Sequence, residues 1–236
     1  MTGKSPLTER VVFGLLASAA RMVPVPLLDD LLREKATHLM VARLLSQRGR
    51  HYASQRVKPL YADNEGCLVG VFTLMLKLAL FPVRKVLAWV LAARYLAQDL
   101  ARAILLGRVL DRLLADGALS SPDDAAILAE AERIRLAFDN AVRGSDLKLL
   151  QGLLGSALRS ASGLPRAAMR TLMRRRHQPE DASAVEGADE SDKRVLESGA
   201  DKIEAALEQP AAKAFLETFD ATFDENMAVL VARKPG

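Results

Sequence analysis

The sequence predicts an all-α protein, and three observations support this fold class. Half of the 236 residues are apolar but only 5% are aromatic, and Leu and Ala predominate. Because unbranched side chains and Ala lose little freedom in a helix, this composition favours helices. No alternating run of β-branched and polar residues is present. We expect an irregular multi-helix bundle with a nearly all-apolar central helix, and a C-terminal amphipathic helix that follows an acidic linker.

The first two helices are expected near 7–22 and 27–48, with Pro24 and Pro26 forming a rigid break between them. Aspartates near the start of the second helix interact favourably with the helix dipole. The second helix has an apolar face that carries Leu28, Leu31, Leu32, Ala36, Leu39 and Met40.

The N-terminal stretch also has the outline of a secretion signal, with an apolar run at 11–16 and small residues at 17–19. Glu9, the shortness of the apolar run and Arg21 favour a first core helix instead, and we expect a core helix. The lone cysteine, Cys67, can form no internal disulfide and fits a reducing compartment. The expected location is the cytoplasm, including the inner face of the membrane.

A connection is expected at 49–66, where turn-forming residues accumulate, and helices follow near 67–81 and 83–116. The next start has a clear signal, because Ser121 can cap a helix whose first position is Pro122. The remaining helices are expected at 122–142, 145–162, 165–177, 193–208 and 211–232.

The last third of the chain changes in charge. Residues 166–176 contain five arginines and no acid, whereas residues 178–192 contain six acids and no base. We expect a disordered acidic linker over 178–192, because it has few bulky apolar residues to offset the entropy of ordering. The chain then divides into a helical bundle at 1–177 and a C-terminal helical hairpin at 193–236 that packs on the bundle. The final helix is amphipathic through Phe215, Phe219, Phe223, Met227 and Leu230.

The arginine-rich helix has two interpretations. Arg166, Arg170 and Arg174 lie four residues apart on one face and could neutralise phosphates of nucleic acid or lipid. No aromatic residues are interleaved for base stacking, and no helix-turn-helix pattern surrounds them. The acidic linker follows at once and can shield these charges within the chain. We therefore expect no nucleic-acid partner.

An 18-residue window at 66–83 carries a single charge, Lys77, and three interpretations of it stay open. As a membrane span, its apolar residues contribute roughly −3 to −6 kcal/mol, which Lys77 at about +2.5 to +3.5 kcal/mol largely offsets. Its helix would extend only about 27 Å, less than a hydrocarbon core of roughly 30 Å. As the central helix of a bundle, the window is typical of a helix that is buried all round.

The third interpretation is peripheral contact with a membrane surface or a membrane-bound partner. Phe81 and Trp89 suit the headgroup boundary, and Pro82 permits a bend. Arg84 and Lys85 could meet anionic lipids at about 1 kcal/mol each. The candidate contact residues are Leu74, Leu78, Phe81, Arg84, Lys85 and Trp89.

No pattern of catalytic or ligand-binding residues is found in the sequence. The three histidines have no second ligand at metal spacing, and we interpret them as surface or helix-flank residues. Gly152, Gly155 and Gly163 match neither a phosphate loop nor a dinucleotide fingerprint, and close helix packing is the preferred interpretation. We expect no enzyme activity, no cofactor, no metal and no small-molecule substrate.

One segment carries a family resemblance. A small-residue helix end at Ala17 leads through a Pro-x-Pro-x-x-Asp turn ending at Asp29 into a helix that carries Met40 and ends at Arg48-Gly49. This segment, 17–49, resembles a bacterial GTPase-associated hydrophobic helical domain family of unknown function. The resemblance implies a membrane-proximal helical accessory protein of bacterial type, since that domain often accompanies a GTPase and tends toward membranes. The chain has no GTP-binding motif, so the resemblance assigns no functional residues.

The sequence therefore predicts a non-enzymatic helical accessory protein that associates peripherally with a membrane or a membrane-bound partner. The alternative is a soluble helical adaptor that binds a protein partner through its C-terminal amphipathic helix. The two hypotheses differ in whether residues within 74–89 or the final helix make the contact.

Overall fold

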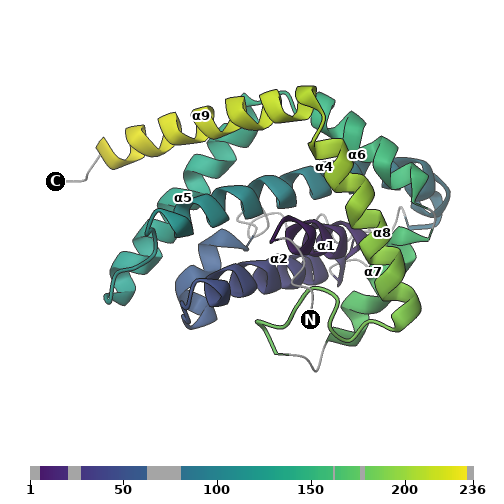
Figure 1. The fold of residues 1–236 in the computed structure, drawn as a ribbon, viewed down its shortest axis with the longest axis horizontal. Coiled ribbons are helices and arrows are strands. Elements are labelled where there is room, and N and C mark those ends of the chain that lie inside the picture. The colour runs from purple at the N-terminus through teal and green to yellow at the C-terminus, as the bar shows by residue number, and fades with distance from the viewer. Residues whose placement is uncertain (1–5, 21–27, 63–80, 162, 176–178, 233–236) are drawn as a thin grey trace.

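The computed structural model describes residues 6–20, 28–62, 81–161, 163–175 and 179–232, and over 81–94 it describes the backbone. Within these ranges the regular secondary structure is helical, without a strand, so the predicted all-α multi-helix bundle is confirmed. In chain order the helices are α1 (Pro6–Ala19), α2 (Leu28–Gln47), the 3-10 helix η2 (Ser54–Leu60), α4 (Phe81–Ala115), α5 (Asp124–Gly144), α6 (Lys148–Ser160), α7 (Leu164–Arg174), α8 (Glu190–Leu207) and α9 (Pro210–Ala232) (Figure 1).

The centre of the bundle is α1, which packs against α2, α4, α7 and α8 (Figure 1). All residues from 11 to 20 are buried, and Ser18 is the one polar residue among them. Gly14 allows the close crossing of α1 and α4, because a Cβ at this position would lie 2.9 Å from Leu100 Cδ1. The N-terminal segment is thus a core helix, as its sequence predicted.

The other helices surround α1 and α4 in two groups (Figure 1). On one side, α2 and α5 enclose η2, and on the other side α6, α7 and α8 pack together. α9 crosses the end of α5 and contacts α6 (Figure 1). A single hydrophobic cluster extends from Val11 in α1 to Phe223 in α9, so helices from both ends of the chain share one core.

The predicted helix boundaries agree with the structure to within three residues wherever the structure describes both ends. The helix expected at 67–81 lies outside the described residues except for Phe81, which begins α4. Within the expected connection at 49–66, η2 forms and buries Val57 and Leu60. On α2, Leu31 is 62% exposed, so it does not belong to the buried face where the periodicity placed it.

Two local interpretations were wrong. The N-cap of α5 is Asp123 rather than Ser121, because the Asp123 Oδ1 accepts a hydrogen bond from the Ala125 amide at 3.1 Å. Close helix packing explains only Gly155, where a Cβ would lie 3.7 Å from the Ala97 Cβ. Gly152 is exposed with open space around it, and Gly163 has a φ of 80° at the start of α7.

The C-terminal third differs from the predicted disordered linker and hairpin. Residues 179–189 lie against α2 and α7, and Ala182 and Ala184 are buried there. Ordering needs no bulky apolar residues here, because arginines of the bundle bind the backbone carbonyls of this segment. α8 packs on α1, α6 and α7, whereas α9 turns away and packs on α5, so both helices return to the bundle without forming a hairpin (Figure 1).

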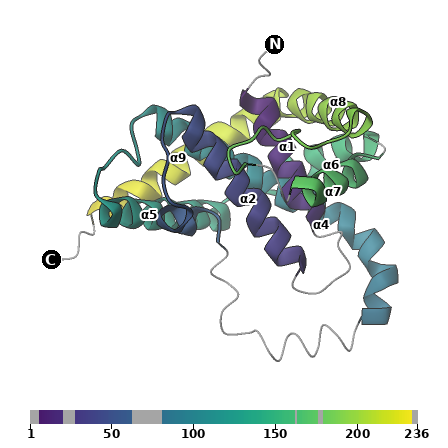
Figure 2. The same ribbon diagram turned by 90° about the horizontal axis from the view of Figure 1, so that it is seen from below.

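The first turns of α4 extend beyond the ends of the neighbouring helices (Figure 2). The helix has 35 residues and is therefore about 52 Å long, which exceeds the length of any other described helix. The second half of α4 is buried in the bundle through residues such as Leu100, Ile104, Leu105 and Leu110. The long helix therefore connects the core to a projecting end.

Candidate interaction surfaces

The predicted contact residues fall in two groups. Leu74 and Leu78 lie outside the described residues. The helical backbone of α4 places Phe81, Lys85 and Trp89 four residues apart along one line, with Arg84 beside them. Phe81, Arg84, Lys85 and Trp89 all lie in the first turns of this helix. Among the helices that the structure describes, none combines the length and the apolar character needed to cross a bilayer.

A cleft of about 60 Å³ lies between α2, α4 and α5. Asp99 and Arg135 line it and are only 7% and 9% exposed. Arg135 donates from Nε to Asp139 at 2.8 Å and from Nη1 to the Leu60 carbonyl at 3.4 Å. Burial raises the pKa of Tyr61, which also lines the cleft. Acids and bases occur together here: Arg135 connects α5 to η2, and Arg102 of α4 lies 3.7 Å from Asp139 of α5.

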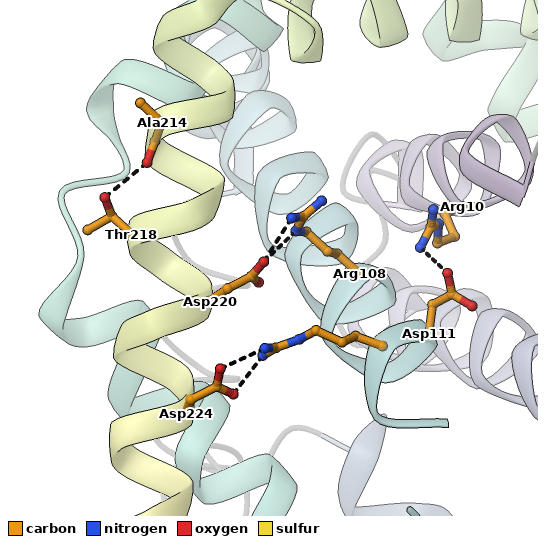
Figure 3. Close-up of polar contacts among 8 residues, drawn as sticks. Arg10, Arg108, Asp111, Ala214, Thr218, Asp220 and Asp224 are labelled. Carbon is orange, nitrogen blue, oxygen red and sulfur yellow. Dashed lines mark hydrogen bonds and ion pairs between the residues drawn. The ribbon is translucent and has the colours of Figure 1, made fainter. Parts of the chain in front are cut away.

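Two arginine–aspartate pairs connect α4 to α9 (Figure 3). Arg108 donates to Asp220 Oδ2 from both Nε and Nη2, at 3.0 and 2.8 Å. Arg112 forms a two-oxygen pair with Asp224, at 2.6 and 2.8 Å. Both partners advance by four residues, so the two pairs are rungs of one ladder between helices that run in the same direction there. The hydrogen bond with Asp224 raises the pKa of Arg112.

A shallow cavity of about 250 Å³ lies beside this ladder, where α1 and α4 meet the junction of α8 and α9. Three cations line it, namely Arg10, Arg108 and Lys213. Each already pairs with a carboxylate, and Arg10 donates to Asp111 at 2.9 Å (Figure 3). An anionic ligand would therefore have to displace an internal ion pair. Leu7, Ile104, Leu207 and Leu216 also line the cavity.

The arginines of α7 are engaged within the chain. Arg170 forms a two-oxygen pair with Asp192, whose side chain is 2% exposed, and this hydrogen bond holds the pKa of Asp192 below its usual range. Arg174 pairs with Asp189. These contacts agree with the interpretation that the acidic segment shields the arginine cluster. Arg166, on the same face, is exposed.

Arg175 is the functional candidate that sequence reasoning missed. It is 1% exposed, and its guanidinium lies 5.3 Å from the ring centroid of Phe13. Burial lowers its pKa. The helical spacing in the sequence could have predicted this burial. Arg175 lies three residues after Leu172 and continues the buried face of Leu164, Ala168 and Leu172, whereas Arg166, Arg170 and Arg174 lie on another face.

The histidines form no metal centre in the described structure. His38 lies 3.6 Å from the carboxylate of Glu180 and packs against the ring of Tyr61 at a centroid distance of 4.5 Å. His51 is exposed, and His177 lies outside the described residues. Within the part of the chain that the structure describes, no group of His, Cys, Asp or Glu side chains could hold a metal ion.

The chain was compared with protein-family models, with curated proteins and with solved structures, and none of them matches it. The resemblance of segment 17–49 to the GTPase-associated helical family therefore stays a prediction.

Proposed function

We propose that the protein is a non-enzymatic helical accessory protein that associates peripherally with a membrane or a membrane-bound partner, at the cytoplasmic face. The observation that carries this proposal is the projecting end of α4, whose first turns extend beyond the neighbouring helices (Figure 2). This end bears the basic pair Arg84 and Lys85 and the only tryptophan of the chain, Trp89.

The composition of this end suits an anionic membrane surface. The helix carries Phe81 and Trp89 eight residues apart, on the side where Lys85 lies between them. Aromatic rings prefer the headgroup boundary, and each Lys or Arg near an anionic surface contributes about 1 kcal/mol. The apolar residues at 66–80 precede this end directly and supply further apolar area.

The state of the final helix supports this proposal over the adaptor hypothesis. Phe219 and Phe223, the centre of the amphipathic stripe on α9, are 0% exposed. Phe219 packs edge-on against Phe138 of α5, with ring centroids 6.0 Å apart. The stripe that was predicted to bind a partner is thus used inside the bundle, and the ladder to α4 holds α9 from another side.

The direct test uses two single-copy residues, because Trp89 is the only tryptophan and Cys67 the only cysteine. The purified chain is mixed with phosphatidylcholine vesicles that contain or lack phosphatidylserine. We expect co-flotation and a blue shift of tryptophan emission with anionic vesicles only. An environment-sensitive dye on Cys67 should brighten in the same samples.

Charge-reversal variants give the matched comparison. Arg84→Glu with Lys85→Glu should weaken vesicle binding by about 30-fold or more, since two contributions of about 1 kcal/mol are lost. The control is Arg143→Glu with Lys148→Glu, two exposed bases near the junction of α5 and α6, which should leave binding unchanged. Full recovery in the soluble fraction with both kinds of vesicle, and unchanged emission, would contradict the proposal.

The adaptor function remains a second candidate because of the last turns of α9. Val229 and Val231 are 50% and 52% exposed beyond the buried stripe. Deleting 178–236 is not a clean test, since α8 contributes Leu196 and Ile203 to the core. The double variant Val229→Ser and Val231→Ser leaves the core intact. Loss of a co-purifying protein partner in this variant, with vesicle binding absent from the native chain, would favour the adaptor.

A further inference from the structure

Residues 179–189, here called the acidic strap, lie against Arg43 and Ser46 of α2 and against Arg175 at the end of α7; the surface that the strap covers there is called the groove below. At the middle of the groove, Arg175 donates from Nη2 to the Ala182 carbonyl at 3.0 Å and from Nη1 to the Ser183 carbonyl. Its guanidinium also lies over the Phe13 ring, 5.3 Å from the centroid. A planar, desolvated fork therefore recognises backbone carbonyls of the strap.

The first half of the strap contacts α2. Arg43 donates from Nη1 to the Asp181 carbonyl at 3.0 Å, and Ser46 Oγ donates to the Asp181 carboxylate at 3.3 Å. The Nε2 of His38 lies 3.6 Å from the Glu180 carboxylate. The groove thus contacts both the backbone and the acidic side chains of the segment that occupies it.

The strap is held with little apolar burial. Its buried side chains are Ala182 and Ala184, and Val185 packs at the edge of the core. Its acidic contacts are solvent-exposed, with the Glu180 and Asp189 side chains 65% and 59% exposed. Such a segment opens at lower free energy than the core beneath it, because few apolar contacts are lost.

We propose that this groove is a recognition site for an acidic peptide segment of a partner protein, and that the strap occupies it in cis as an intramolecular competitor. This site is separate from the projecting end of α4 and does not depend on the membrane proposal. The cis strap shows what fits: small side chains at two buried positions, carbonyls that face Arg175, and carboxylates toward α2.

A peptide fits these contacts better than a polyanion does. The central arginine binds two carbonyl oxygens instead of phosphates or carboxylates, and alanine methyl groups fill the buried positions next to it. Neither a lipid surface nor a nucleic acid offers carbonyls and small apolar groups in this alternation. The groove therefore recognises polypeptide backbone together with acidic charge.

The cis arrangement sets the strength of the competition. A segment tethered by short connections is present at an effective concentration of about millimolar. A free peptide of the same sequence therefore cannot displace the strap at micromolar concentration. A partner succeeds only when it makes additional contacts or when the strap is disabled, so the strap acts as an autoinhibitory cover.

The test replaces residues 180–186 by Gly and Ser at equal length and titrates the chain with a synthetic peptide of residues 179–188, followed by nuclear magnetic resonance. The strap-replaced chain should bind the peptide at least about 10-fold more tightly than the native chain does. In the replaced background, Arg175→Lys should weaken binding by about 10-fold, because lysine keeps the charge but cannot hold two carbonyls in one plane. Arg166→Lys, at an exposed position of α7, is the matched control.

Two results would overturn the proposal. One is equally tight binding of a scrambled peptide of the same composition, which would show that the peptide binds through its charge alone and not through its sequence. The other is binding of inorganic polyphosphate as tight as that of the peptide and insensitive to Arg175→Lys, which would assign the surface to polyanions. Circular dichroism of each variant confirms that the bundle has folded.

A measurement on the native chain tests the same proposal without any substitution. The amides of Ala182, Glu186 and Ala188 donate only to carbonyls within the strap, at 3.2, 3.0 and 3.1 Å. In hydrogen exchange they should open faster than the amides of α1 and α7. Peptide in millimolar excess should accelerate these three amides alone. Exchange of strap and core at one common rate, unaffected by the peptide, would overturn the proposal.

Discussion

Arg108 on α4 donates to one carboxylate oxygen of Asp220 on α9 from both its Nε and its Nη2. The Asp220 side chain is 14% exposed, whereas Asp224 in the next rung is 54% exposed. The two rungs therefore differ in solvent screening although their chemistry is the same. This difference makes the ladder a useful test of how α9 is held.

Truncation of the ladder should have unequal effects. Asp220→Ala should lower the free energy of unfolding by about 1–3 kcal/mol, because it removes a charge-assisted hydrogen bond from a largely buried position. Asp224→Ala should lower it by less than about 1 kcal/mol, as is typical of exposed pairs. Urea denaturation gives both values. Arg194→Ala is the control, since Arg194 lies 3.8 Å from Glu190 in an exposed pair. An equal loss of unfolding free energy in Asp220→Ala and Asp224→Ala would contradict the conclusion that the more buried rung stabilises the fold more.

Two glycines should resist substitution by alanine. A Cβ at Gly199 would lie 2.5 Å from Leu164 Cδ1, and one at Gly14 would lie 2.9 Å from Leu100 Cδ1. Each alanine should destabilise the bundle by about 1–3 kcal/mol, because the buried leucine side chain or the crossing helix must shift to make room for the new methyl group. Gly152→Ala is the matched control and should stabilise the chain by about 0.5–1 kcal/mol, since that helical position is open. Thermal unfolding measures all three, and a stabilising Gly199→Ala would refute the close crossing.

The pairing of Asp192 with Arg170 predicts an acid-dependent contribution to stability. The hydrogen bond from Arg170 lowers the pKa of Asp192 in the folded chain, whereas an unfolded aspartate titrates near about 3.9. The contribution is therefore fully present above about pH 4 and is lost as the pH falls through the lower pKa of the folded state. Asp192→Asn should be less stable than the native chain from pH 5 to 8, and the difference should shrink below about pH 4.

Thermal melts across this pH series check the prediction about Asp192. Asp201→Asn, at an exposed position on α8, should follow the native chain throughout. A gap between the native chain and Asp192→Asn that stays constant down to pH 2 would show that the carboxylate charge is not the stabilising feature.

The cap of α5 can be tested in the same way. Asp123→Ala removes the side-chain acceptor of the Ala125 amide and should cost about 0.5–2 kcal/mol. Ser121→Ala should cost less, because Ser121 Oγ accepts only from the Asp123 amide, which precedes the helix. A larger loss of stability in Ser121→Ala than in Asp123→Ala would indicate that Ser121 is the N-cap, as the sequence predicted.

Local signals in the sequence were sufficient for the helices. The apolar period of the final helix placed Phe219 and Phe223 on one face, and both are buried. Caps were predicted less accurately, because Ser121 and Asp123 are both good capping residues and only tertiary context decides between them. Periodicity thus gives the elements and their faces, but it leaves their ends uncertain by a turn.

The centre of the bundle could not be predicted in this way. The window at 66–83 is apolar over a longer stretch than residues 11–20, and within the described structure α1 is the helix that other helices surround. Apolar composition indicates that a helix is buried, but not whether it is buried in the protein's own core, against a partner or in a membrane. The position of α1 depends on contacts with helices distant in sequence.

Arg175 is a second example of this limit. Five arginines of similar local context occur in 166–176, and one of them is buried under the strap. Its acceptors are the carbonyls of Ala182 and Ser183, whose directions depend on turns that no side-chain pattern specifies. The composition of the segment predicted disorder because composition counts apolar side chains and takes no account of backbone acceptors.

The central place of α1 has a consequence for how the chain is made. Of the described helices, α1 leaves the ribosome before the others, but two of its neighbours, α7 and α8, follow only after α2, α4, α5 and α6. At the usual elongation rate, roughly 10–40 s pass between the emergence of α1 and that of α8. During this interval the strongly apolar turns at 11–20 await their final neighbours, so nascent chains should depend on a chaperone more than the finished protein does.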